Sequence, residues 1–431
     1  MATSSKVVLT PSIRSEYAVP NLTKESAERA SQLLQENHER HDLIFRDSGV
    51  HNHIVHHILT SFALGADPNT LQKHYDNNAS YQRAPPAVDD QVVQDFQNPA
   101  KFLESLSTKS YCRNYLVFFE KELEEKGYEK VLKEYVFKGD ERANVMFARL
   151  YSGFLHPMIH LGFGVEFGQP TIIAEALALA CIHPAWQDPF LFAAEETATR
   201  DQYPSECLVR ILDNIRADKK LSTAAHWDDD NKIRDGIILR AKQEMVQYAS
   251  QWRVDPEKLE EATAEMINAA IYFTAGAQRP PKQVKFDFYY MHSVNCSIFF
   301  SSFLKQPWIS TANKVKLLEW KGRLDLCLYA SRRSPTLLLD EITNYVPKHP
   351  QASDWDAIIE RAKVFGDDGH ACKFVRALAH AEQVCAPWEH SEKFRIKGKM
   401  WLQLGNMAID SVEDTGDTWV RSAGFDEAWE K

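Results

Sequence analysis

Apolar residues recur every three to four positions along most of the chain, a spacing that places them on one face of an α-helix. Alternating β-branched runs and Asn-Gly turns are missing, and Val7 to Thr10 is the one short strand candidate. The pattern therefore predicts an all-α protein. Its expected helices cover residues 22–39, 51–64, 114–124, 141–155, 171–182, 231–251, 256–275, 282–304, 311–331, 354–364 and 370–385.

The order of these segments predicts one large domain. No Gly/Ser-rich linker, low-complexity run or repeat of 30 to 50 residues divides the chain, so a regular solenoid is not expected. We expect a short N-terminal arm at residues 1–20 and a single large irregular helical domain at residues 21–431. Proline-rich breaks mark the places where that domain could divide into two lobes: Pro85-Pro86, Pro280-Pro281 and Pro347 to Pro350.

Composition narrows the class of protein. The chain has 431 residues, is 44% hydrophobic and carries a formal net charge of −10 without a basic stripe, which argues against nucleic-acid binding. It lacks a secretory core near its start and a long apolar run elsewhere, so we expect a soluble cytoplasmic protein with no membrane contact. Its seven cysteines contain no Cys-x-x-Cys pair, which predicts reduced thiols rather than disulfides or a zinc ribbon.

The chemistry is concentrated in histidines on apolar helical segments. His370 and Lys373 lie three residues apart and so share one helix face. In the cluster from His51 to His57, His53 and His57 share a face and His56 stands beside it, because adjacent helical residues point about 100° apart. Surface histidines with one buried, hydrogen-bonded member are the plainer interpretation of this cluster. Taken together, the segments indicate one buried metal.

A second pair, His156 and His160, has the i, i+4 spacing that can direct two imidazoles at one ion. Pro157 fits best in the first turn of a helix, which would place His156 near a helix start. The nearby Gly162-x-Gly164 only superficially resembles a dinucleotide fingerprint, because the next glycine comes one residue too late and no strand precedes it. A Rossmann interpretation is rejected.

The segment Phe286 to Phe300 places His292 in an aromatic-rich helix with Asn295 nearby. A lone buried histidine is usually structural, but this setting could also form an apolar pocket for a flat aromatic ligand. Neutral imidazoles suit iron, zinc or copper, and an added oxygen ligand shifts the preference toward iron. A buried Lys373 with a lowered pKa could capture CO2 and supply that oxygen as a carbamate. The alternative is a surface lysine paired with Glu360 or Asp367.

In this order the motifs resemble those of the questin oxidase-like family, whose fungal members act in aromatic polyketide pathways. The resemblance covers nearly the whole chain, and four short motifs carry it: Asn52-His53, Gly153-Phe-Leu-His156, His292 with Asn295, and His370-x-x-Lys373.

The resemblance implies a mononuclear non-haem iron bound by four histidines and a carboxylated lysine. The implied ligands are His53, His156, His292, His370 and Lys373, with Lys373 and Asn295 in catalytic roles. Asn295 stands where threonine is expected in the family, so a hydrogen bond to the carbamate or to bound oxygen is expected to differ. Three further histidines are reserve candidates for metal ligation, namely His57, His160 and His380.

The implied reaction is oxygen-dependent cleavage of a C–C bond that opens the quinone ring of a questin- or emodin-like anthraquinone to a benzophenone. The implied cofactors are Fe(II) and a CO2-derived carbamate on Lys373, with NADPH entering only through a partner reductase. Two alternatives stay open: an NADPH-dependent Baeyer–Villiger-type monooxygenase on the same substrates, and a non-catalytic polyketide-binding protein.

Overall fold

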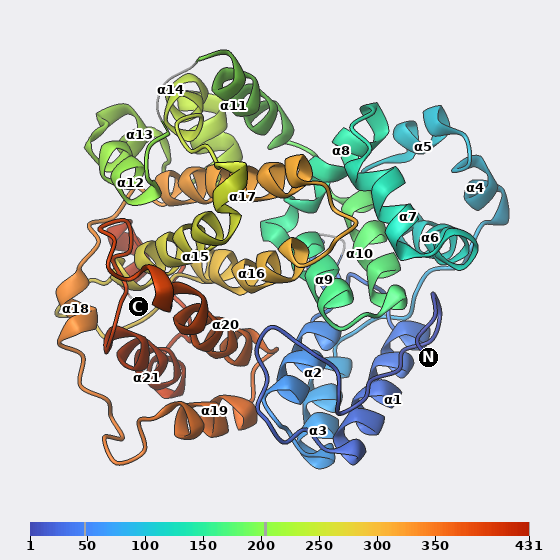
Figure 1. Ribbon diagram of the computed structural model, residues 1–431, viewed down its shortest axis with the longest axis horizontal. Helices are drawn as coiled ribbons and strands as arrows, with labels where there is room; N and C mark the ends of the chain where they lie inside the picture. The colour runs from blue at the N-terminus through green and yellow to red at the C-terminus, as the bar shows by residue number, and fades with distance from the viewer. Residues whose placement is uncertain (47–48, 202–204, 431) are drawn as a thin grey trace. The chain divides into compact units, whose positions relative to one another are not determined.

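The computed structural model describes residues 1–46, 49–201 and 205–430 and is all-α, as the periodicity predicts (Figure 1). Within these ranges there is no β-strand, only isolated bridges. The helices predicted at residues 311–331 and 370–385 have those bounds, and most others differ by a few residues. None of the helices in the described ranges combines the length and apolar character needed to cross a membrane.

The chain divides into two compact units. The first contains Met1–Ala185, Lys305–Ile309 and Lys363–Lys373, and the second contains Trp186–Leu304, Ser310–Ala362 and Phe374–Lys431. The helices of the first unit are α1 (Lys24–Arg40), α2 (Ile54–Ala63), α3 (Pro68–Ala79), α4 (Asp90–Asp95), α5 (Pro99–Ser105), α6 (Cys112–Lys126), α7 (Tyr128–Leu132), α8 (Glu141–Leu150), α9 (His156–Glu166) and α10 (Pro170–Ile182).

The helices of the second unit are α11 (Asp188–Arg200), α12 (Leu208–Ala217), α13 (Lys219–Ala224), α14 (Leu239–Ala249), α15 (Leu259–Gly276), α16 (Phe288–Leu304), α17 (Thr311–Ser331), α18 (Leu339–Thr343) and α21 (Met400–Glu413). Two helices contribute residues to both units, α19 (Trp355–Val364) and α20 (His370–Cys385). The residues of α20 up to Lys373 belong to the first unit.

The core of the first unit is built around α9 and α10. Every residue of α9 is buried, and so is every residue of α10 after Pro170. A helix that is apolar on all sides must be surrounded by protein, and α10 packs against α9, α6 and α8. Gly164 in α9 permits the close approach, because a Cβ there would lie 2.7 Å from Cγ1 and 2.9 Å from the backbone nitrogen of Ile173. Gly162 and Gly164 both lie inside α9 and so form no nucleotide loop, and Gly164 serves helix packing.

The N-terminal arm does not form the strand that Val7 to Thr10 suggested. Its backbone amides instead donate to side chains of the first unit: Val7 to Gln35, Val8 to Gln169 and Leu9 to Ser31, over 2.8–3.0 Å. Side-chain acceptors thus replace the ladder partner that a strand would need.

In the second unit, α16 begins at Phe288, whereas the sequence predicted a start at residue 282. The carboxylate of Asp287 accepts from the amides of Tyr289 and Tyr290 at 2.8 and 3.0 Å, which caps the first turn. The residues before it are extended and pair with the C-terminal segment, where the Phe288 amide donates to the Val420 carbonyl over 2.7 Å. The helix start is therefore fixed by a contact distant in sequence.

Two other predicted helices are interrupted. Residues 231–251 contain a π-helical stretch at Lys232–Ile238 before α14, and residues 141–155 contain α8 followed by a 3-10 turn at Gly153–Leu155. Three successive residues of that turn, Gly153, Phe154 and Leu155, have φ angles of 54°, 54° and 69°. The left-handed region is unfavourable for residues with a side chain, so periodicity alone could not foresee the break.

The packing of α9 on α10 gives the first prediction. Gly164→Ala should lower the free energy of unfolding by about 1–3 kcal/mol, because the new methyl group meets the backbone of Ile173 as well as its side chain. Urea denaturation would measure this loss. The control is Gly366→Ala, where nothing lies within 4 Å of the added carbon. Equal stability of the two variants would refute the close-packing role of Gly164.

Candidate metal centre

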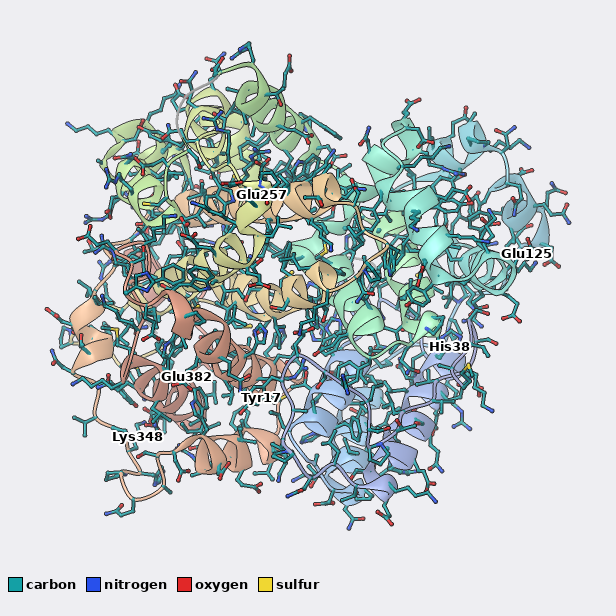
Figure 2. All side chains as sticks on the ribbon, in the orientation of Figure 1. Tyr17, His38, Glu125, Glu257, Lys348 and Glu382 are labelled. Carbon is teal, nitrogen blue, oxygen red and sulfur yellow. The ribbon has the colours of Figure 1, made fainter. Side chains whose placement is uncertain are left out.

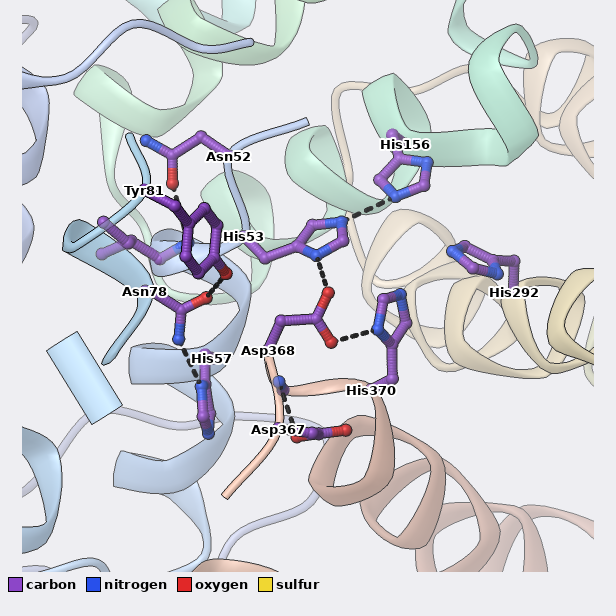
Figure 3. A network of polar contacts seen from close by, with 12 residues as sticks. Asn52, His53, His57, Asn78, Tyr81, His156, His292, Asp367, Asp368 and His370 are labelled. Carbon is purple, nitrogen blue, oxygen red and sulfur yellow. Dashed lines mark hydrogen bonds and ion pairs between the residues drawn. The ribbon is translucent and has the colours of Figure 1, made fainter. Parts of the chain in front are cut away.

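Three imidazoles of the first unit converge on one point (Figure 3). His53 lies just before α2, while His156 and His370 begin α9 and α20. One nitrogen from each ring lies within 4.8 Å of the others, and all three side chains are buried. The Nε2 atoms of His53 and His156 are 2.9 Å apart. The structure therefore brings together three of the four histidines that the family resemblance implied as ligands.

Hydrogen bonds to oxygen fix which nitrogen of each ring carries the proton. The carboxylate of Asp368 accepts from Nδ1 of His53 over 2.9 Å and from Nδ1 of His370 over 2.5 Å. The backbone carbonyl of Gly153 accepts from Nδ1 of His156 over 2.6 Å. Because these oxygens only accept, each Nδ1 is protonated and each Nε2 of a neutral ring carries a lone pair.

This tautomer pattern tests whether the residues fit a metal. Two neutral rings would direct lone pairs at each other across the 2.9 Å between His53 and His156, an arrangement that a shared proton or a cation relieves. Burial lowers the pKa of His53, which disfavours the proton. Two nitrogens bound at right angles to one ion, about 2.1 Å from it, would be about 3 Å apart. The site therefore fits a metal cation.

The segment that carries His370 is held by a second carboxylate. Asp367 accepts from the amides of Gly369 and Ala371 over 2.7 and 2.9 Å and so fixes the start of α20. Burial and the neighbouring Asp368 raise the pKa of Asp367 to about 7. Burial also acts to raise the pKa of Asp368, but His370 and His53 outweigh it and hold that pKa well below its usual value. Asp368 is thus an anion between two imidazoles.

Asp368 is a site residue that the sequence motifs did not predict. Its only local signal is a carboxylate two residues before a candidate histidine ligand, which is common in loops. The left-handed turn before His156 was not predicted from the sequence either. Phe154 and Leu155 hold strained left-handed conformations next to a site residue, and such strain is typical of functional sites.

Lys373 lies one turn into α20 and is only 4% exposed. Burial lowers the pKa of its amine, and Nζ has no hydrogen-bond partner within the described part of the chain. The alternative of a surface lysine is therefore wrong. A lowered pKa favours the neutral amine, which is the form that reacts with CO2.

The neighbouring histidines of the first unit have other partners. Nδ1 of His57 lies 3.0 Å from the Asn78 amide, and its ring stacks on His74 with centroids 4.0 Å apart. Nε2 of His160 donates to Glu175 over 2.7 Å, so His156 and His160 do not direct their nitrogens at one point despite their spacing. The helix prediction for residues 51–64 was also wrong at its start, because Asn52 accepts from the Ile54 amide and His53 precedes the first turn.

His292 and Asn295 lie on α16 in the second unit. Nδ1 of His292 donates to the Phe288 carbonyl over 2.6 Å, so its tautomer matches that of the three convergent rings. The Asn295 amide nitrogen lies 2.9 Å from Sδ of Met291, and its Oδ1 has no hydrogen-bond partner in the described ranges. His380 is buried on α20, also in the second unit. The ligand role of His292 and the catalytic role of Asn295 stay predictions.

Comparison with known proteins agrees with the motifs. The family model described as questin oxidase-like matches residues 50–378. A Baeyer–Villiger oxidase of Pestalotiopsis fici is 42% identical over 95% of this chain and 94% of its own length. Questin oxidases of Aspergillus terreus and Aspergillus fumigatus are 38% and 37% identical, each over 100% of this chain and 98% and 99% of their own lengths.

These matches make the protein an oxidoreductase. The chain belongs to the questin oxidase-like family, and the resemblance read from its four motifs is confirmed.

A buried ion pair in the first unit gives the second prediction. His38 of α1, labelled in Figure 2, lies between Glu175 and Glu120 with N···O distances of 2.8 and 2.9 Å. Burial opposes the charged form of His38, but the two carboxylates outweigh burial and raise its pKa from 6.5 to about 9. The pair should therefore stabilise the fold fully below pH 6.5, and that contribution should be lost as the pH rises through about 9.

His38→Gln should remove this pH dependence, which is worth about 3 kcal/mol at most. The measurement is the free energy of unfolding of the wild type and of His38→Gln, obtained by denaturant titration at pH values below and above about 9. His226→Gln, at an exposed histidine, is the control and should keep the wild-type profile. A wild-type profile that His38→Gln leaves unchanged would contradict the charged state of His38.

Proposed function

We propose that this protein is a non-haem iron-dependent dioxygenase that opens the quinone ring of an anthraquinone to a benzophenone carboxylate. The observation that carries the proposal is the set of three buried imidazoles, each with one ring nitrogen within 4.8 Å of the others and with an oxygen acceptor at its Nδ1. A buried lysine with a lowered pKa lies on the helix that carries one of them. The names of the relatives supply the substrate class, an anthraquinone such as questin.

In this proposal His53, His156 and His370 hold the metal, and Lys373 adds an anionic oxygen as a carbamate. Family resemblance adds His292 as the fourth imidazole. Three neutral imidazoles alone would suit zinc, copper or iron, and the carbamate oxygen moves the preference toward iron. Bound iron supplies oxygen activation and Lewis-acid polarisation of the substrate carbonyl.

The protein's own residues orient the ligand rings and increase their basicity. The Asp368 carboxylate fixes two ligand rings and raises their basicity, and the Gly153 carbonyl does the same for His156. The burial of all three rings excludes water from the reaction. The reaction balances when the substrate is the two-electron-reduced anthraquinone: with one O2 it gives the hydroxybenzophenone carboxylic acid and retains both oxygen atoms. A partner reductase using NADPH would supply the two reducing equivalents.

The second candidate is an NADPH-dependent Baeyer–Villiger-type monooxygenase, which the name of the relative from Pestalotiopsis fici favours. The two reactions differ in the fate of oxygen. A monooxygenase places one oxygen atom in the product and releases the other as water.

Metal content gives the third prediction. Protein purified without oxygen and with bicarbonate should hold close to one iron per chain, measured by elemental mass spectrometry. His53→Ala and Lys373→Ala should lose most of it, and Asp368→Asn should bind iron about 10–100-fold more weakly, because an amide cannot accept from both rings. His390→Ala and Lys397→Ala, at exposed positions, should retain the wild-type content. Iron that survives both alanine substitutions in the site would refute this ligand set.

The carbamate has its own readout. Protein prepared with 13C-labelled bicarbonate should show a carbamate resonance by 13C NMR, and Lys373→Ala should not. His292→Ala tests the fourth ligand in the same way as His53→Ala, by its iron content. An unchanged iron content in His292→Ala would remove His292 from the ligand set and leave the other three in place.

The fourth prediction concerns the reaction. With chemically reduced anthraquinone, 18O2 and no NADPH, the enzyme should turn over and place two labelled atoms in the benzophenone acid, as mass spectrometry would show. One labelled atom, with turnover only when NADPH is present, would favour the monooxygenase. Binding of the anthraquinone without metal or oxygen consumption would favour the non-catalytic binding protein.

A further inference from the structure

A chain of buried polar contacts in the first unit is not used by the proposed metal ligands. It begins at Glu120 of α6 and passes through His38 of α1 to Glu175 of α10. Nε2 of His160 in α9 lies 2.7 Å from the second oxygen of Glu175, and Nδ1 of His160 lies 3.2 Å from Nε2 of His56 in α2. His56, His160 and Glu175 are at most 2% exposed.

The direction of each hydrogen bond in this chain follows from the charges of His38 and Glu175. His38 is an imidazolium at neutral pH; it donates to Glu175 and forms an ion pair with Glu120. Glu175 is anionic, because its two histidine partners outweigh burial and lower its pKa to about 2. An anionic carboxylate only accepts, so His160 donates through Nε2, and a ring with that single proton accepts through Nδ1. Nε2 of His56 is therefore the donor to His160, and Nδ1 of His56 carries the lone pair.

That lone pair has no hydrogen-bond partner within the residues that the structure describes. Most buried polar atoms in proteins are paired, so an unpaired acceptor on a side chain 1% exposed requires an explanation. The His56 ring stacks on Phe163 with centroids 5.2 Å apart. It also lies 5.6 Å from the His53 ring and 6.1 Å from the His156 ring, centroid to centroid. A donor bound at His56 would be next to the candidate metal ligands.

We propose that His56 is a substrate-binding residue that accepts a hydrogen bond from a free phenolic hydroxyl, and that Glu175 and His160 are positioning residues that set its tautomer. The inference rests on the proposed function for the class of substrate. It adds a requirement: the substrate presents a hydroxyl, and not its methyl ether, at this position. Phe163 offers an apolar face beside the hydrogen bond, as an aromatic ring requires.

Glu175→Gln distinguishes positioning from simple structural support. The His38 donor would hold the new amide with its oxygen toward His38 and its NH2 group toward His160. His160 would then have to accept through Nε2 and donate through Nδ1. The two bonds on the His56 side of position 175 reverse, the one to His160 and the one between His160 and His56, and Nδ1 of His56 becomes a donor. This single substitution should therefore invert the chemistry of His56 without changing the size of any side chain in contact with the ligand.

The first experiment is 15N NMR of histidine-labelled protein, in which protonated and unprotonated ring nitrogens have different shifts. The wild type should show His56 unprotonated at Nδ1, and Glu175→Gln should show it protonated there. His56→Phe assigns the resonance, and Glu122→Gln, a buried carboxylate that accepts from Tyr135, is the matched control with an unchanged spectrum at His56. A proton at Nδ1 of His56 in the wild type would overturn the inference.

The second experiment measures binding of 2-hydroxyanthraquinone and 2-methoxyanthraquinone by equilibrium dialysis without oxygen, in mildly acidic buffer that keeps the hydroxyl protonated. The wild type and Glu122→Gln should bind 2-hydroxyanthraquinone at least about tenfold more tightly than 2-methoxyanthraquinone. His56→Phe should bind the two within about threefold, and Glu175→Gln should prefer the ether. Equal binding of both compounds by the wild type would overturn this inference alone. No binding of either would overturn the anthraquinone assignment of the proposed function, and with it the phenol at His56.

Discussion

The candidate centre depends on one carboxylate that holds two imidazoles. Asp368 accepts from His53 and from His370, and the first of these bonds joins residues 315 positions apart in the chain. Each bond orients a ring and fixes its proton on Nδ1, which leaves Nε2 available to a metal. The anion also offsets the cost of gathering basic groups in a buried region. Without this carboxylate, His53 and His370 would lose the shared acceptor that sets their tautomer and orientation.

The first unit contains buried polar groups of two kinds, those with hydrogen-bond or ion-pair partners among the described residues and those without. Glu175 and His38 are buried but fully paired, and their charges alternate along the chain that leads to His56. Lys373 and Nδ1 of His56 are equally buried and have no hydrogen-bond partner in the described ranges. A fold tolerates such groups where a ligand, a metal or a covalent modification completes them. Asp367 fixes the start of α20, the helix that presents Lys373.

Much of the fold could be predicted because helical periodicity is a local property of the sequence. The bounds of α20 and the apolar character of α10 follow from residues within a few turns of one another. The errors arise where distant residues decide the helix start. The start of α16 is capped by Asp287, whose other carboxylate oxygen accepts from Ala423, and α2 begins after Asn52, whose side chain contacts Asn37. The left-handed turn at Phe154 and Leu155 has no sequence signal, since both residues normally avoid it.

The sequence by itself determined the helical class, the family and the identity of the candidate ligands, because the four motifs lie within short segments. Only the tertiary structure decided that His156 faces His53 while His160 faces Glu175, and that Lys373 is buried rather than a surface residue. It also revealed Asp368 as the support of two rings. The physical reason is that tautomer, burial and pKa depend on neighbours contributed by other helices, and one-dimensional spacing contains no information about those neighbours.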